Sequence, residues 1–367
     1  MTNIQNRGGC NWGLDLLRIV AMLMIVGNHF MVHGIQFQNI SGSSLNLAIA
    51  FLYYSFSRVD VNCFVLISGY FLIQKNSFSW KKVLRLWIQV LFYSVLFCLL
   101  LWGTEAHSIK EMIKAFLPIK TNQYWFITCY VGLYLLHPFL NCIAINITKR
   151  QYLYLLFLLV GMFSIYSFKG GTFTGNGSLL WFITLYFTGG YIRKYGIPWS
   201  VKQSVGLYVA SALTTYLGLN VHLLVKGNFF SGTLIGNNSP SVFLGSVALF
   251  CIFKDMKINE KCFQKIIQFL APATFGVYLI HDNNFVRPYL WHDLLNVKQY
   301  LASDYFFLFF IGIVCVVFVG CIGIEKLREV LFGFCERQFQ KPINCMNQQI
   351  FRCYKSIQSY IMRAFMA

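Results

Sequence analysis

Charged residues are scarce in this chain. Asp, Glu, Lys and Arg together make up 11% of its 367 residues, against about 25% in a soluble globular domain. Hydrophobic residues make up 57% of the chain and aromatic residues 18%. The shortage of charge excludes a compact soluble protein, and the aromatic content is typical of a lipid-facing surface with interfacial belts.

Metal and nucleophile motifs are also missing. The 12 Cys include no Cys-x-x-Cys pair and no Cys/His cluster with zinc-like spacing, so we predict no metal site. Ser68-Gly69 is not part of a Gly-x-Ser-x-Gly motif, which favours close helix packing over a nucleophile at this position. No internal repeat or low-complexity linker occurs.

Acidic residues are few, at 12 against 30 Lys and Arg, which gives a net charge of +18. Basic residues collect in the cytoplasmic loops of membrane proteins, so this excess does not require a nucleic-acid partner, and no nucleic-acid-binding motif is present. We therefore predict no nucleic-acid binding. The bilayer itself is the expected surrounding of the chain.

The sequence contains many apolar segments of roughly 20 residues, the length needed to span a bilayer. They predict an all-α, polytopic membrane helix bundle with about ten transmembrane helices. The second is long and contains Arg58 and Asp60, which suggests a break. The predicted segments are 13–33, 46–73, 83–103, 124–146, 151–168, 179–195, 203–225, 239–254, 266–285 and 304–325.

The placement of Lys and Arg predicts the orientation of these segments. With the N-terminus inside the cell, most of the 30 Lys and Arg residues fall in inner connections, as the positive-inside rule requires. We predict a multi-pass protein of the cell membrane with both termini in the cytoplasm. Residues 1–327 form the predicted transmembrane domain, and residues 328–367 form a basic amphipathic cytoplasmic tail.

The first apolar segment carries four ionisable side chains, and such residues are costly inside a membrane. Arg18 and His29 are eleven residues apart, which is about three helical turns, so they lie on one face and are separated by roughly 16 Å along the axis. Asp15 lies one turn before Arg18, and His33 follows one turn after His29. A histidine deep in a bundle suits general base catalysis, although a structural, hydrogen-bonded histidine is the simpler alternative.

The Arg18-x10-His29 spacing within GLDLLRIVAMLMIVGNHF (13–30) resembles the first helix of the acyltransferase-3 family of integral membrane O-acyltransferases, of the polysaccharide O-acetyltransferase type. VDVNCFVLISGYFL (59–72) resembles the family's second motif, with Cys63 where an aromatic residue is common. YWFITCYVGLYLLHPFLN (124–141) and FGVYLIH (275–281) are similar to later segments of the family.

The resemblance implies transfer of an acyl group, with acetyl favoured, from cytoplasmic acyl-CoA to a hydroxyl of a surface polysaccharide or its lipid-linked precursor. It implies that His29 is catalytic and that Arg18 serves the donor, acetyl-CoA. Lys81, Lys82 and Arg85 have the charge to hold the donor's phosphates at the inner mouth of the bundle. His29 would act as a general base or become acylated.

Other candidate residues have competing interpretations. Asp60 is a second catalytic candidate, and a buried structural pair with Arg58 is equally compatible. Trp125 and Trp181 begin helices, where Trp is usually an interfacial anchor. The alternative for both is a place lining the acyl pocket, and Trp125 is the candidate substrate-binding residue. His281 is either an acceptor-binding residue or an ordinary interfacial histidine.

Two classes of function fit a polar path through ten helices. One is the acyltransferase, and the other is a transporter or flippase for a glycan or small solute. Transporters often contain repeated halves, which this chain lacks, and the spacing of Arg18 and His29 has a more specific catalytic than transport rationale. We therefore favour the enzyme, and the sequence leaves open a homo-oligomer.

Overall fold

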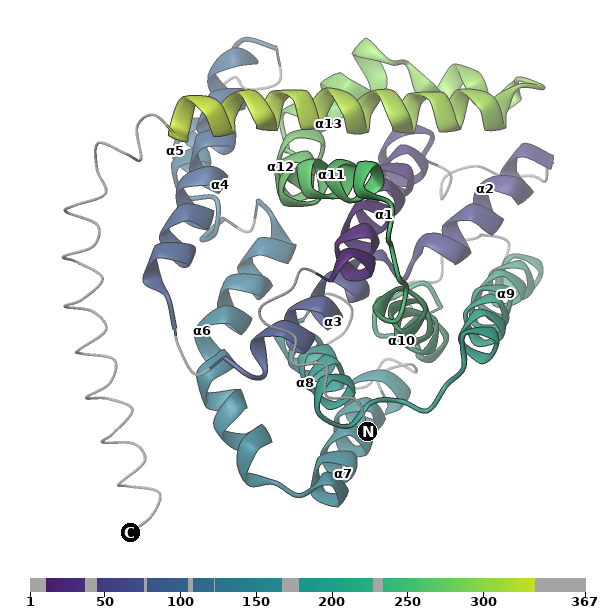
Figure 1. Ribbon diagram of the computed structural model, residues 1–367. Coiled ribbons are helices and arrows are strands. Elements are labelled where there is room, and N and C mark those ends of the chain that lie inside the picture. The colour runs from purple at the N-terminus through teal and green to yellow at the C-terminus, as the bar shows by residue number, and fades with distance from the viewer. Residues whose placement is uncertain are drawn as a thin grey trace.

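The computed structural model describes residues 11–36, 45–75, 78–104, 108–121, 123–166, 178–226 and 234–333. These residues form helices joined by short connections, with no β-strand among them (Figure 1). The predicted all-α class is therefore confirmed. The part of the predicted cytoplasmic tail that follows residue 333 lies outside the described residues.

Each of the ten predicted segments forms helix. Seven helices among the described residues are long and apolar enough to cross a membrane, and the remaining three segments form shorter helices, of which Pro240–Lys254 is apolar. The seven are Trp12–Gly34, Leu45–Leu72, Trp80–Leu100 (α4), Trp125–Asn146 (α6), Val201–Lys226 (α9), Lys261–His281 and Phe306–Gly333. The three others are α7 (Lys149–Val160), which continues as the π-helix η3 (Gly161–Tyr166), α8 (Leu179–Tyr195) and α10 (Pro240–Lys254).

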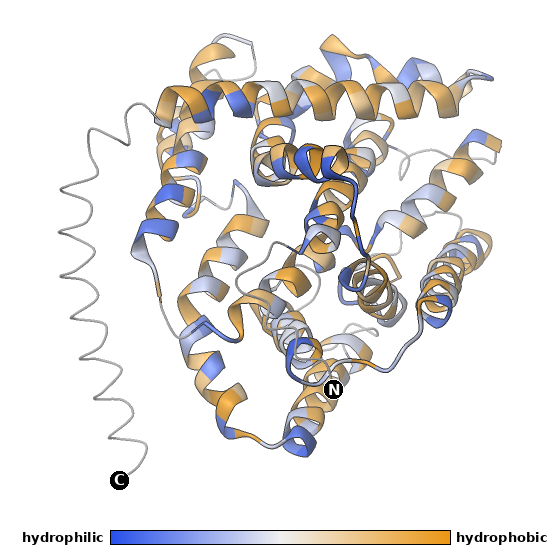
Figure 2. Cartoon of the chain, in the orientation of Figure 1, coloured by the Kyte–Doolittle hydropathy of each residue, from blue (hydrophilic) through white to orange (hydrophobic). Residues whose placement is uncertain are grey.

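The outer surface of the bundle is apolar, as a lipid-exposed surface must be. Large hydrophobic side chains such as Phe157, Leu217, Leu224 and Val316 are exposed. Figure 2 shows hydrophobic positions along most helices, including their outward sides. An exposed apolar surface of this extent is incompatible with water and identifies the chain as a multi-pass membrane protein.

Helix α1 (Trp12–His29) lies at the centre of the bundle (Figure 1). It packs against α2 (Leu45–Ser57), α3 (Asp60–Leu72), α10, α11 (Lys261–Leu270) and α12 (Thr274–His281). Its start is fixed by Asn11, whose side chain accepts a hydrogen bond from the Leu14 backbone N–H, an N-cap that satisfies one of the unpaired donors of the first turn. After His29 the chain continues as one π-helical stretch, η1 (Phe30–Gly34). Wider turns of this kind frequently occur at functional sites.

The second span is broken, as the sequence suggested. Helix α2 (Leu45–Ser57) ends before Arg58, and α3 (Asp60–Leu72) begins two residues later. Arg58 thereby follows the negative end of one helix dipole, while Asp60 lies in the first turn of the next helix, at its positive end. The break places two charged residues inside the bundle, where irregular backbone is tolerated only if it lines a cavity or is covered by protein.

A second break divides the ninth segment. Helix α11 (Lys261–Leu270) is followed by a 3-10 turn, η5 (Ala271–Ala273), which contains Pro272, and then by α12 (Thr274–His281). The eight residues of α12 rise only about 12 Å, so α12 ends inside the protein at His281. The chain then returns through short helical turns, α13 (Val286–Pro288), η6 (Tyr289–Leu294) and η7 (Val297–Ala302), to the Phe306–Gly333 helix.

A close helix crossing lies between α3 and α8. A Cβ added at Gly69 would lie 2.3 Å from the Tyr186 carbonyl oxygen, and one added at Gly189 would lie 2.3 Å from the Leu66 carbonyl oxygen. The small residues let the two backbones touch, as in many membrane helix pairs. Gly69 is therefore a packing residue, in agreement with the interpretation of Ser68-Gly69 from sequence.

Replacement of Gly189 by Ala tests this crossing. We expect Gly189→Ala to lower the free energy of unfolding by roughly 1–3 kcal/mol, because the new methyl group forces the two backbones apart. Thermal unfolding in detergent measures the effect. Gly206→Ala on α9 is the matched control, since nothing lies within 4 Å of its added Cβ; equal melting temperatures for the two variants would contradict the close crossing.

Candidate active site

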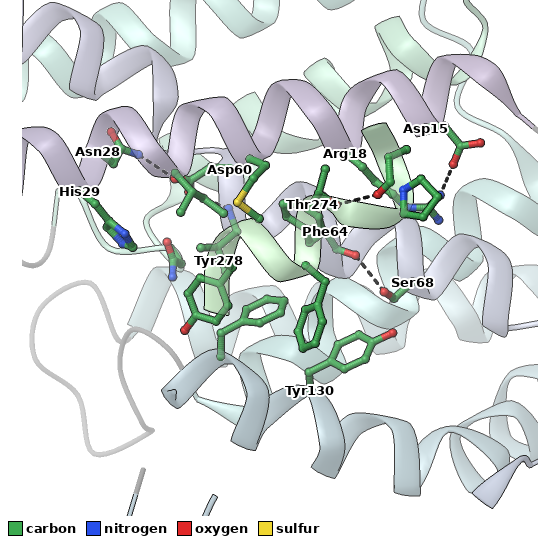
Figure 3. A pocket seen from close by; sticks show the side chains of 18 of the residues that line it. Asp15, Arg18, Asn28, His29, Asp60, Phe64, Ser68, Tyr130, Thr274 and Tyr278 are labelled. Atoms are coloured by element: carbon green, nitrogen blue, oxygen red, sulfur yellow. Dashed lines mark hydrogen bonds and ion pairs between the residues drawn. The ribbon is translucent and has the colours of Figure 1, made fainter. Parts of the chain in front are cut away.

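A cavity of about 970 Å³ runs beside α1, with Arg18 near one end and His29 near the other (Figure 3). Both residues line it, as their shared helix face predicts. Polar residues from other helices and connections also line it, among them Arg58, Asp60, Asn237 and Thr274. The cavity therefore connects Arg18 with His29, the two residues that were predicted to share one face of the first helix.

At the Arg18 end, the guanidinium forms an ion pair with Asp15 one turn earlier. It also lies over the Phe71 ring, with its central carbon 5.6 Å from the ring centroid. The side chain is 32% exposed and lines the cavity together with Trp12 and Ser68. Arg18 is thus held in place by its neighbours and still has donors that face the cavity.

Lys81, Lys82 and Arg85 lie on the first two turns of α4 and do not line the cavity. They are partly or fully exposed. Leu86, the residue after Arg85, does line the cavity. The three basic residues are therefore placed outside the cavity wall, on a helix that contributes to it.

At the other end, His29 Nδ1 lies 2.9 Å from His281 Nε2. His281 Nδ1 lies 2.6 Å from the Val277 carbonyl oxygen. A carbonyl oxygen only accepts, so His281 Nδ1 carries the hydrogen, and neutral His281 accepts at Nε2. His29 must then donate from Nδ1, which leaves the Nε2 lone pair of neutral His29 free to take a proton.

A charged pair lies beside the two histidines. Asp282 Oδ1 lies 3.5 Å from His29 Nδ1 and 4.0 Å from His33 Nε2. Arg287 Nη2 lies 3.0 Å from the same oxygen and also donates to the Asp282 carbonyl oxygen. Asp282 is consequently placed to stabilise positive charge on His29, while Arg287 compensates the negative charge of Asp282.

Tyr124 and Asn283 fix the position of His281 and Asp282. The Tyr124 hydroxyl donates to the Leu279 carbonyl oxygen at 2.9 Å, and Asn283 Nδ2 donates to the Tyr124 hydroxyl oxygen at 2.7 Å. Asn283 Oδ1 in turn accepts from the Phe285 backbone N–H. These bonds join the end of α12 to the start of α6 and to the turn that carries Arg287.

The ligand atoms of His29, His33 and Asp282 lie within 4.8 Å of one another, a spacing that a metal ion can bridge. Arg287 is already 3.0 Å from the carboxylate oxygen of this set, and its positive charge opposes a divalent cation there. The donor set therefore fits a proton-transfer site better than a metal centre.

Asp60 is buried and lines the cavity, and it does not contact His29 directly. Asn28 Nδ2 donates to Asp60 Oδ2 at 2.7 Å, and the Val61 backbone N–H donates to Oδ1 at 2.6 Å. Asn28 precedes His29 on α1, so Asp60 reaches the histidine only through its neighbour. A catalytic role for Asp60 remains a prediction.

The two tryptophans differ from each other. Trp125 lines the cavity, the alternative that the sequence left open. Trp181 is fully buried and donates from Nε1 to Asn62 Oδ1 at 3.1 Å, so its interpretation as an interfacial anchor is wrong. A buried Trp needs a hydrogen-bond acceptor, and Asn62 supplies one in the interior.

Sequence reasoning missed Asn28, Tyr124, Arg287 and Asn237. Asn28 directly precedes His29, and Tyr124 directly precedes Trp125, so a polar side chain next to a candidate residue was a signal that could have identified both. Arg287 and Asn237 lie in connections between helices, and no sequence pattern predicts that these connections fold back into the bundle.

Comparison with known families identifies the class of protein. The acyltransferase domain of the acyltransferase-3 family matches residues 11–325, so the chain belongs to that family and is a membrane acyltransferase. The predicted resemblance to the acyltransferase-3 family is confirmed. Searches of curated proteins and of solved structures find no match.

The hydrogen bond from His29 to His281 predicts that His281 sets the tautomer of His29. We expect His281→Phe to reduce the turnover number of acyl transfer by at least about tenfold, because the loss of an orienting partner leaves the base in the wrong tautomer. Steady-state kinetics with acetyl-CoA, the donor predicted from the sequence, measure this effect, and its KM should stay unchanged.

His222→Phe is the matched control, because His222 lies on α9 and does not line the cavity. Wild-type turnover in His281→Phe would contradict the orienting role. Restored turnover in His281→Gln, whose side-chain oxygen can accept from His29 Nδ1, would support it.

Proposed function

We propose that this protein is an O-acetyltransferase that moves an acetyl group from acetyl-CoA to a hydroxyl of a cell-surface polysaccharide or its lipid-linked precursor. The observation that carries the proposal is one cavity lined by both Arg18 and His29, with the His29 tautomer set by His281. Arg18 suits the anionic donor, and the Nε2 lone pair of His29 suits the hydroxyl acceptor.

The dimensions of the cavity support acyl-CoA as the donor. Arg18 and His29 are separated by roughly 16 Å along α1, a distance suited to the long, thin pantetheine arm. Arg18 would bind a donor phosphate through charge-assisted hydrogen bonds. Lys81, Lys82 and Arg85 would bind the nucleotide outside the cavity wall, which is consistent with their exposure.

The chemical step follows from the free Nε2 of His29. The acceptor hydroxyl gives its proton to Nε2 as its oxygen attacks the thioester carbonyl carbon. The carbonyl oxygen becomes an oxyanion, which collapses as the C–S bond breaks. The CoA thiolate then takes the proton from His29, so the products are the ester and free CoA. Acylation of His29 itself would instead need two such steps.

The direction of transfer rests on the expected orientation. With both termini in the cytoplasm, the Arg18 end of the cavity faces the cytoplasm, where acyl-CoA is found, and the His29 end lies in the outer half of the cell membrane. Trp125 and His281, at or near the cavity, would then contact the acceptor. A transporter or flippase would also use such a cavity. It would not need two histidines, His29 and His281, whose hydrogen bonds fix the tautomer of each ring.

The proposed reaction is tested by replacing His29. We expect His29→Ala to lower acetylation of the surface glycan by at least about 100-fold, the usual contribution of a general base, while protein level and membrane insertion stay at wild-type values. NMR of O-acetyl esters on glycans from cells with and without the protein measures the effect and identifies the acceptor.

Normal ester content in His29→Ala cells would contradict the catalytic role. Loss of the whole glycan from the surface of cells without the protein, with unchanged esters on what remains, would support the transporter instead.

The donor site is tested by replacing Arg18. We expect Arg18→Ala to weaken acetyl-CoA binding by about tenfold or more, because a charge-assisted hydrogen bond to phosphate is lost. Calorimetry with purified protein in nanodiscs measures the affinity. Arg150→Ala is the control, since Arg150 lies on α7 and contacts Tyr154.

Acetylpantetheine, which lacks the nucleotide, separates phosphate binding from a general loss of structure. Arg18→Ala should bind it as wild type does. Equal weakening for both ligands, or unchanged acetyl-CoA affinity, would contradict the assignment of Arg18 to the phosphates.

A further inference from the structure

Arg58 lies in the break between α2 and α3 and lines the same cavity as His29. Its Nε donates to the Ile235 carbonyl oxygen at 2.8 Å, and its Nη2 donates to Asn237 Oδ1 at 2.9 Å. The guanidinium lies over the Tyr54 ring, 5.3 Å from the ring centroid. All of these partners are neutral.

No carboxylate lies within 4.0 Å of Arg58 in the described part of the chain. Asp60 is only two residues away, but its oxygens accept from Asn28 and from the Val61 backbone instead. An intramembrane arginine normally pairs with an opposite charge or serves a ligand. The charge of Arg58 is therefore available to an anion in the cavity.

Arg58 is at the same depth in the bundle as His29. The Ser57 hydroxyl donates to Asn28 Oδ1 at 2.5 Å, and Asn28 Nδ2 donates to Asp60 Oδ2 at 2.7 Å. Ser57 precedes Arg58 and Asn28 precedes His29, so these bonds hold the break of the second span beside the end of α1. Negative charge that develops next to His29 is thus formed beside Arg58.

The wall behind Arg58 is built to stay in place. Asn62 Nδ2 donates to the Asn237 carbonyl oxygen at 2.7 Å, while Asn62 Oδ1 accepts from buried Trp181. Ser164 on η3 donates to the Asn238 carbonyl oxygen at 2.6 Å. A cation fixed in this way needs no rearrangement when charge appears, which is the condition for strong transition-state stabilisation.

We propose that Arg58 is a further catalytic residue, whose guanidinium stabilises the oxyanion formed when the acceptor attacks the acetyl thioester. This role rests on the proposed acetyl transfer. As the acceptor oxygen bonds to the carbonyl carbon, the π electrons of the carbonyl move to its oxygen, and the hydroxyl proton moves to His29 Nε2. The negative oxygen faces Arg58 until the C–S bond breaks and CoA leaves.

The test is cleavage of acetyl-CoA by purified protein in nanodiscs, with hydroxylamine as a small uncharged acceptor. We expect Arg58→Gln to lower the turnover number for CoA release by about 100-fold or more, the usual loss when one oxyanion donor is removed. The KM for acetyl-CoA should change less than about twofold, because the oxyanion exists only in the transition state. Arg58→Lys, which keeps the charge, should retain part of the activity.

Arg193→Gln is the matched control. Arg193 also donates to two neutral oxygens, those of Gln74 and Tyr70, and lies 4.8 Å from the Tyr70 ring centroid, but it does not line the cavity. Its replacement should leave CoA release at the wild-type rate. If Arg193→Gln lowered the rate of CoA release as much as Arg58→Gln, the loss would reflect folding, and the proposal would be overturned.

Two further outcomes separate this role from others. Wild-type turnover with hydroxylamine in Arg58→Gln, together with reduced acetylation of the glycan in cells, would assign Arg58 to an anionic group of the acceptor and overturn the oxyanion role. Wild-type protein that does not cleave acetyl-CoA would contradict the acetyl transfer itself, and this proposal with it.

Discussion

The hydrogen bond between His29 and His281 is the interaction on which the rest of the site depends. It joins residues that are 252 positions apart, one at the end of the central helix and the other at the end of a short, interrupted helix. Both helix ends must meet inside the bundle for the bond to form. The capping of α1 by Asn11, the π-helical turn after His29 and the Tyr124–Asn283 bonds all serve to place these two rings.

The two broken spans make that meeting possible inside a membrane. A continuous helix hides its backbone but has no place for polar groups to converge, whereas a broken helix exposes backbone that must be satisfied elsewhere. At the break between α2 and α3, the Ser57 carbonyl oxygen accepts from Asn28 Nδ2 and the Phe56 carbonyl oxygen accepts from the Tyr208 hydroxyl. At η5 the break contains Pro272. The backbone groups freed at the first break thus find partners on neighbouring helices, while Arg58 and Asp60 beside it line the cavity.

The sequence predicts most of the fold because lipid imposes a strong length and hydropathy constraint. All ten segments form helix, and the helical period correctly places Arg18 and His29 along one cavity. What the sequence does not predict is decided by tertiary contacts. Trp181 begins a helix like an interfacial anchor, yet it is buried because Asn62 supplies an acceptor. Arg58 and Asp60 are two residues apart, yet each binds different neighbours because the helix break points their side chains to different partners.

The charges around His29 suit a reaction that separates and recombines charge. In the resting site Asp282 is compensated by Arg287, and His29 and His281 share one neutral hydrogen bond. In the proposed reaction His29 would gain a proton while the thioester oxygen gains a negative charge, so the net charge of the site would not change. Asp282, 3.5 Å from His29 Nδ1, would stabilise the new cation and interact more weakly with the neutral ring. An interaction that strengthens only as the reaction proceeds lowers the barrier without tightening substrate binding. A neutral histidine partner with a carboxylate beside it would therefore serve the proposed reaction better than a direct His–Asp pair, which would favour the protonated form of the base before the acceptor arrives.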